Sequence, residues 1–320
     1  MPPLLDTPTS PPDNLRATVP PRLDPVPIER ALALCAALLL GAGLIFWVAA
    51  NWQEQTRQFK YHLLQSAVLA PALFAVWHPA RLPCLLLATL SLGGLLAFVG
   101  QTYQTGADPW QLFAVWAALS LVWTVLSRHD VLWTVWVLIC GTAIGLWSGG
   151  HLLSAFARPW SFMGIDTFAS LAWLLLAALP FALTRFALLG PTRAPRPAVF
   201  SQRLATWMAL GAWSTYALWA LMGHDETFVG TYFFNAALIG MTAYIAWASR
   251  PRDIVVLAGA ALAFDTVFLA TVFKFMFLNS SFDDPVGLVL LFTLIAAGTV
   301  GGSSLWVFRQ QRQANKEIPQ

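Results

Sequence analysis

The sequence predicts an all-α, polytopic transmembrane helical bundle of about ten spans, with both termini in the cytoplasm. Two features support this prediction. Hydrophobic residues make up 58% of the 320 residues and charged residues only 10%, whereas charged residues form about 25% of an ordinary soluble domain. The Lys and Arg residues are also unevenly placed, because fourteen of the eighteen fall in the termini or in every second gap between apolar runs.

The apolar runs have the length of membrane spans, which need about 20 mostly apolar residues, with about 17 to 25 acceptable. They predict helices near residues 31–50, 61–78, 84–103, 110–127, 131–150, 167–188, 204–222, 231–248, 254–278 and 286–308. Eight spans are the main alternative to ten. The long gap between the fifth and sixth runs is also suited to a short interfacial helix.

The regions outside these runs complete the predicted organisation. Residues 1–27 are rich in proline and follow no helical period, which is typical of a disordered tail. They lack the basic start, apolar stretch and cleavage site of a signal peptide, so the first apolar run is expected to remain as a span. We divide the rest into an N-terminal membrane half at 28–150, a C-terminal membrane half at 151–309, and a cytoplasmic tail at 310–320.

The cations predict the orientation, because cytoplasmic loops of membrane proteins are rich in Lys and Arg. The cation-rich side comprises both tails and the even-numbered gaps, and it holds Arg16, Arg22, Arg30, Arg81, Arg128, Arg185, Arg193, Arg196, Arg203, Arg250, Arg252, Arg309, Arg312 and Lys316. The other side holds Arg57, Lys60, Arg158 and Lys274. Both termini are therefore expected in the cytoplasm, which favours an even number of spans.

Several functional classes lack support in the sequence. The cations form no basic stripe, so nucleic acid is not an expected partner. The three cysteines all fall within or beside apolar runs, unlike those of a disulfide framework. No phosphate-binding loop or nucleophile elbow is present, and His62, His151 and His224 lack the spacing of a metal-ligand pair. We expect no cofactor and no metal; the expected partner is the lipid bilayer, with a membrane-protein partner or a homo-oligomer left open.

Two segments combine small residues with amide and aromatic side chains at the outer ends of the first and third spans. They are residues 38–55 and 90–113, and aligning Gly43 with Gly94 suggests a parallel repeat over roughly 31–127. The amide–aromatic cluster that they form is a hypothetical ligand site made of Asn51, Trp52, Gln101, Tyr103, Gln104, Asp108 and Trp110. The same side chains also suit helix caps and interfacial anchors, and Asp108 followed by Pro109 is typical of a helix start.

The segments GAGLIFWVAANWQ and GQTYQTGADPWQLFAVWAALSLVW resemble the bacterial membrane-protein family known as domain of unknown function 2157. The Asn-Trp element and the Gln-x-Tyr…Asp-Pro-Trp element occur in order, and the resemblance is clearest over residues 31–150. It implies a multi-pass protein of the bacterial inner membrane. It supplies no established activity and no catalytic residue.

Asp265 is the second candidate, because it lies near the middle of the predicted span 254–278. An ionisable group there costs roughly 2.5–3.5 kcal/mol on insertion scales and usually faces the bundle interior or a water-filled cavity. We consider Asp265 a hypothetical proton- or ion-coupling residue, with Asn235 or a hydroxyl such as that of Thr266 as its hydrogen-bond partner. A neutral buried acid that helps to pack helices is the alternative. Lys274 falls on the opposite helix face.

Small residues spaced four apart predict close helix packing. Three such pairs are Gly141 with Gly145, Ala236 with Gly240, and Gly298 with Gly302.

Taken together, these patterns favour a non-enzymatic envelope sensor or scaffold. A small-solute or proton-coupled transporter that uses Asp265 is the first alternative. The second is a membrane enzyme that acts on a lipid-linked substrate at the outer face, for which Glu54, Asp108 and His62 are the available acid–base groups.

Overall fold

The computed structural model describes residues 25–51, 53–77, 80–103, 106, 108–127, 129–155, 165–185, 199–223, 226–249, 252–278 and 285–316. Over these residues the chain forms ten α-helices, and a π-helical segment, η2, directly continues the ninth. In chain order the elements are α1 (Pro25–Ala50), α2 (Arg57–Trp77), α3 (Arg81–Tyr103), α4 (Pro109–Ser127), α5 (Asp130–Ala155), α6 (Ile165–Arg185), α7 (Val199–Met222), α8 (Glu226–Ala248), α9 (Ile254–Phe273), η2 (Lys274–Leu278) and α10 (Pro285–Lys316). The predicted all-α class is confirmed.

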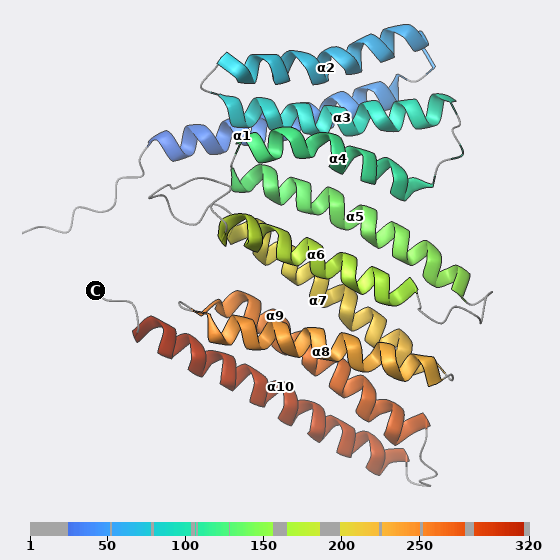
Figure 1. The fold of residues 1–320 in the computed structure, drawn as a ribbon, viewed down its shortest axis with the longest axis vertical. Helices are drawn as coiled ribbons and strands as arrows, with labels where there is room; N and C mark the ends of the chain where they lie inside the picture. The colour runs from blue at the N-terminus through green and yellow to red at the C-terminus, as the bar shows by residue number, and fades with distance from the viewer. Residues whose placement is uncertain are drawn as a thin grey trace, which may run out of the picture.

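The helices lie side by side in an elongated stack that broadly keeps the order of the chain, except that α1 packs on α3 and leaves α2 at the edge (Figure 1). Helix α2 lies at one edge against α3, and α10 lies at the other edge, where it contacts α9 and η2. Between these edges, α7 contacts α5, α6, α8 and α9. The largest buried cluster surrounds α7 and includes Trp133, Trp173 and Trp213. The largest buried cluster is therefore centred on α7 and shared between the two halves of the described chain.

Eight of the described helices are long and apolar enough to cross a membrane. Helix α7 is outside this set, and of α6 the fully described apolar part is the shorter stretch Thr167–Leu179; both helices lie within the stack (Figure 1). In α7 the composition follows from its position, because polar side chains such as those of Ser201, Thr206 and Ser214 are buried against neighbouring helices. A helix enclosed on most sides by other helices has less need of a lipid-compatible surface.

The start of α1 and the end of α10 lie at the same end of the stack, on the left in Figure 1. We call this the cation-rich end, because Arg30, Arg81, Arg203 and Arg309 are near the helix ends there. The opposite end holds Arg57 and Lys60 at the start of α2 and Lys274 after α9. The uneven distribution of Lys and Arg along the sequence therefore places most of the described cations at one end of the stack.

Several predicted helix ends differ from the structure by a turn or more. Helix α1 begins at Pro25, within the segment predicted as a tail, and α10 continues to Lys316. The added residues of α10 are polar but include Arg, Gln, Ala and Lys, which are strong helix formers. The predicted tail 310–320 is therefore helical through Lys316. In the gap after residue 150, α5 continues to Ala155, and residues 156–164 lie outside the described part.

The small-residue pairs give a mixed result. A Cβ atom on Gly141 would lie 2.3 Å from Met208 Cε of α7 and 3.3 Å from Trp173 Cζ3 of α6, so the close packing predicted there is confirmed. The same prediction is wrong for Gly240, Gly298 and Gly302, whose Cβ positions meet no described residue within 4 Å outside their own helix turn. These glycines border open space because α8 and α10 are each packed on α9 rather than on each other.

Candidate functional site

The amide–aromatic cluster lies at the end of the stack opposite the cation-rich end, where α1 and α3 end and α2 and α4 begin (Figure 1). The side chain of Asn51 donates from Nδ2 to the carbonyl oxygen of Trp47, 2.8 Å away. It therefore caps its own helix. Gln101 and Tyr103 are exposed in the last turn of α3. Trp52 and Gln104 lie outside the described residues.

The second half of this cluster forms the start of α4. Asp108 is exposed, and its carbonyl oxygen accepts a hydrogen bond from Gln111 N, 3.0 Å away. Pro109 is the first helical residue, as expected for proline at the N1 position. Trp110 is half-buried. The described members share one end of the stack, and the contacts made by Asn51 and Asp108 are those of helix ends.

Asp265 occupies a different environment in the middle of the span formed by α9 and η2. Its side chain is 5% exposed. Oδ2 accepts a hydrogen bond of 2.6 Å from Ser303 Oγ of α10, while Oδ1 is buried and has no hydrogen-bond partner within the described part of the chain. A buried polar atom without a partner is uncommon, because desolvation is then uncompensated. The unpaired oxygen therefore makes Asp265 a candidate for contact with a further group.

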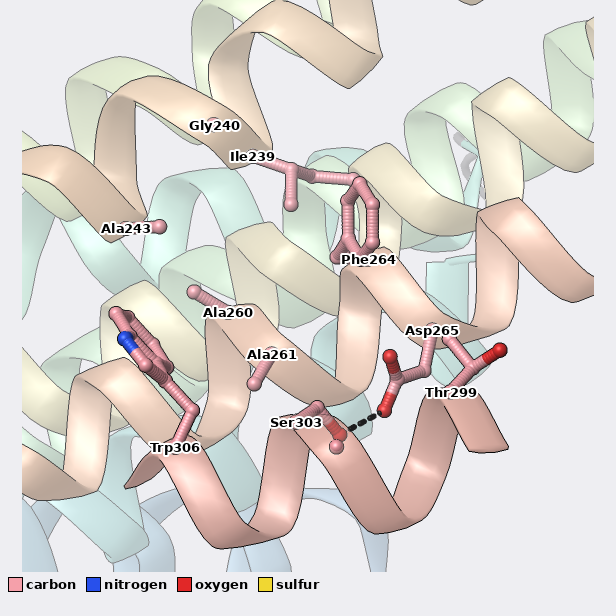
Figure 2. Close-up of a pocket in the computed structure, with 11 residues that line it drawn as sticks. Ile239, Gly240, Ala243, Ala260, Ala261, Phe264, Asp265, Thr299, Ser303 and Trp306 are labelled. Atoms are coloured by element: carbon pink, nitrogen blue, oxygen red, sulfur yellow. Dashed lines mark hydrogen bonds between the residues drawn. The ribbon is translucent and has the colours of Figure 1, made fainter. Parts of the chain in front are cut away.

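Asp265 borders a pocket of about 420 Å³ between α8, α9 and α10. Figure 2 shows one carboxyl oxygen directed at Ser303 and the other directed away from it. Small residues from the three helices line most of the pocket, namely Gly240, Ala243, Ala260, Ala261 and Gly302. The rings of Phe264 and Trp306 also line it, and both are partly exposed. We call this hollow the Asp265 pocket.

Asn235 does not share this pocket with Asp265. It is fully buried, and its Oδ1 atom accepts a hydrogen bond of 2.8 Å from Ser170 of α6. Its Nδ2 atom donates to Thr231 O, 2.9 Å away. Thr266 donates to Leu262 O, so neither partner expected for Asp265 bonds to it. Lys274 donates to Leu221 O at the end of α7, in agreement with its predicted separation from Asp265.

Ser303 and Trp306 were not identified from the sequence as site residues. Both lie in an apolar helix where a serine or a tryptophan is unremarkable. The available signal was the group Gly298, Gly301 and Gly302, which marks α10 as a helix with a small-residue face. That signal indicated packing, whereas the structure shows a face left open.

The groups considered for acid–base or metal chemistry are separate from the Asp265 pocket. Glu54, His62 and Asp108 are all exposed near the opposite end of the stack. Within the described residues, no group of three or more His, Cys, Asp or Glu side chains could hold a metal ion. The side chains of His151 and His224 lie outside the described part.

The N-terminal part of the chain matches one known protein family. Residues 15–133 match the model of the family described as a predicted membrane protein (DUF2157). The resemblance indicated by the Asn-Trp and Asp-Pro-Trp elements is confirmed over this segment, which contains both. No curated protein and no solved structure matches the chain. The chain is thus a membrane protein with several apolar helices, and its Asp265 pocket lies outside the matched segment.

Proposed function

We propose that this protein is a non-enzymatic sensor of the bacterial inner membrane that binds its ligand within the bilayer, at the Asp265 pocket. The observation that supports the proposal is the buried Oδ1 atom of Asp265, which has no hydrogen-bond partner among the described residues. Ionisable residues inside a membrane are costly and usually serve a function. If Asp265 served only to pack helices, its hydrogen bond with Ser303 would be enough. The open pocket beside Asp265 is suited to a ligand.

We further propose that all ten helices span the membrane, with the cation-rich end in the cytoplasm. The charge asymmetry supports this orientation. Reporter fusions after Gly106 and after Gly223 test it, because both sites belong to the end opposite the cation-rich end. Activity of a periplasmic reporter at both sites is the expected result. Activity of a cytoplasmic reporter at either site would reverse the orientation.

The sensor proposal is tested by complementation. In a strain that lacks the chromosomal copy, envelope phenotypes are recorded under osmotic, detergent and amine stress. Plasmid-borne wild-type protein is expected to restore growth, and Asp265→Asn is expected to fail while reaching the same level in the membrane. Asn has nearly the same shape and still accepts from Ser303, so the loss would reflect the carboxyl group. Full restoration by Asp265→Asn would contradict the proposal.

A proton-coupled transporter is the second candidate, and one observation favours it. The span that carries Asp265 ends in the π-helical segment η2, and such segments often occur at functional sites. Proteoliposomes with an internal pH dye separate the two candidates. The sensor is expected to leave proton permeability at the level of empty vesicles. A flux that disappears in Asp265→Asn would replace the sensor by the transporter.

A further inference from the structure

The Asp265 pocket has chemical properties that restrict its ligand. None of the described residues that line it carries a positive charge, and Asp265 is the only acidic one. The carboxyl group already accepts a hydrogen bond from Ser303. In the carboxylate form its free oxygen, Oδ1, needs a hydrogen-bond donor, and a cationic donor would leave that pair without net charge. Pairing of this kind is what makes a buried charge tolerable.

The remainder of the pocket is suited to an apolar body. Gly240 and Gly302 have open space at their Cβ positions, and Ala261 lies between Asp265 and Trp306 along the hollow (Figure 2). Aromatic rings such as that of Trp306 provide a large apolar area against which a hydrocarbon body can pack. The volume of about 420 Å³ is within the range of small-molecule sites, which is about 300–1,000 Å³.

The depth of the pocket argues against a lipid as the ligand. Asp265 is near the middle of the span Ile254–Leu278, where phospholipids present acyl chains rather than headgroups. Acyl chains have no hydrogen-bond donor for Oδ1. A compact molecule that carries its own donor into the hydrocarbon region meets both requirements.

We propose that the Asp265 pocket binds apolar amines in their protonated form, with an ammonium N–H donating to Asp265 Oδ1 and the hydrocarbon body lying along Ala261 toward Trp306. This inference rests on the proposed sensor function and names the class of ligand. It requires no other protein, so it can be tested on the purified chain.

The test is calorimetric titration of the full chain in lipid nanodiscs, with empty nanodiscs as the blank. The probes are adamantylamine and adamantanol, which share one apolar body and differ in the charged group. A hydrogen bond to a charged group is worth about 1.5–3 kcal/mol, which corresponds to at least about ten-fold in affinity. The wild-type protein is expected to bind the amine at least about ten-fold more tightly than the alcohol.

Three variants locate the binding. Asp265→Asn is expected to weaken amine binding by at least about ten-fold and to remove the preference over the alcohol. Gly302→Leu is expected to abolish binding by filling the pocket, whereas Gly298→Leu on the same helix is the matched control. Gly298 also has open space at its Cβ position but does not line the pocket.

Each outcome decides the proposal. Equal affinity for amine and alcohol, or wild-type affinity in Asp265→Asn, would overturn it. If Asp265→Asn fails to fold, wild-type affinity in Gly302→Leu would still overturn it. Failure of the sensor proposal is a separate result, since it appears as complementation by Asp265→Asn whether or not the purified protein binds amines.

Discussion

Arg203 Nε of α7 lies 3.0 Å from Asp253 Oδ2, at the start of α9. The same carboxylate caps α9, because Asp253 Oδ1 accepts from the backbone N–H groups of Val255 and Val256 at 3.2 and 3.3 Å. One side chain therefore fixes the start of the helix that carries Asp265 and ties it to the central helix α7.

Asp253→Ala is expected to lower the free energy of unfolding by about 1–2 kcal/mol, because it removes a helix cap. Arg203→Ala is expected to cost no more than about 1 kcal/mol, since the ion pair is partly exposed. Unfolding in mixed micelles measures both values. Asp253→Asn is the control that keeps a capping oxygen and loses the charge, so its cost should be close to that of Arg203→Ala. Equal losses in Asp253→Ala and Arg203→Ala would show that the cap contributes little.

The helices were predictable because each apolar run is long and ends in polar or charged residues. Helix ends were less predictable where the helix continues beyond the apolar run. Hydropathy marks where a helix leaves the bilayer, whereas Lys316 ends α10 only after a polar extension of good helix formers. Which helices pack against one another could not be predicted from the sequence either, because this depends on how the surfaces of the helix faces fit together.

The candidate site was predictable only in part. An aspartate within an apolar run is conspicuous, and Asp265 is buried as such a residue should be. Its partner could not be derived, since a hydroxyl on α10 and an amide on α8 were equally available to a lone sequence. The structure selects Ser303 because α10 packs on α9, while Asn235 faces Ser170 on α6.

Gly93 in α3 is a position where added volume should be costly. A Cβ atom there would lie 2.4 Å from Trp116 Cζ2 of α4. The indole cannot shift freely, because its Nε1 atom donates to Thr89 O at 2.8 Å. Gly93→Ala is therefore expected to destabilise the protein by about 1–3 kcal/mol.

The matched control is Gly100→Ala, in the same helix, where a Cβ atom meets nothing within 4 Å. It is expected to be neutral or to stabilise by up to about 1 kcal/mol through higher helix propensity. Thermal unfolding in detergent compares the two variants. If both shift the transition equally, helix propensity rather than the Trp116 contact governs this site.

His129 should make stability depend on pH. It precedes α5, and its Nδ1 atom accepts from Val131 N at 3.3 Å. Burial lowers the pKa of His129, while Asp130 raises it and Arg30 lowers it. The unfolded chain then binds more protons than the folded one near the ordinary pKa of about 6.5, so stability rises with pH there. This contribution to stability is lost as the pH falls, first through the pKa of His129 in the unfolded chain and then through its lower pKa in the folded protein.

The measurement is the difference in melting temperature between wild type and His129→Asn from about pH 7 to about pH 5. Asn can cap the helix without titrating. The wild type is expected to lose stability more steeply with falling pH than the variant. Parallel curves would show that the protonation of His129 has no effect on folding.

The bond between Ser170 and Asn235 should contribute to stability without contributing to ligand binding. Both side chains are fully buried, and the Oγ–Oδ1 distance is 2.8 Å. Hydrogen bonds between membrane helices average about 0.6 kcal/mol and reach about 1.7 kcal/mol. A double-mutant cycle with Ser170→Ala and Asn235→Leu is expected to give a coupling energy in that range. Asn235→Leu should leave adamantylamine affinity unchanged, because Asn235 does not line the pocket. A loss of affinity equal to that of Asp265→Asn would instead place the two residues in one site.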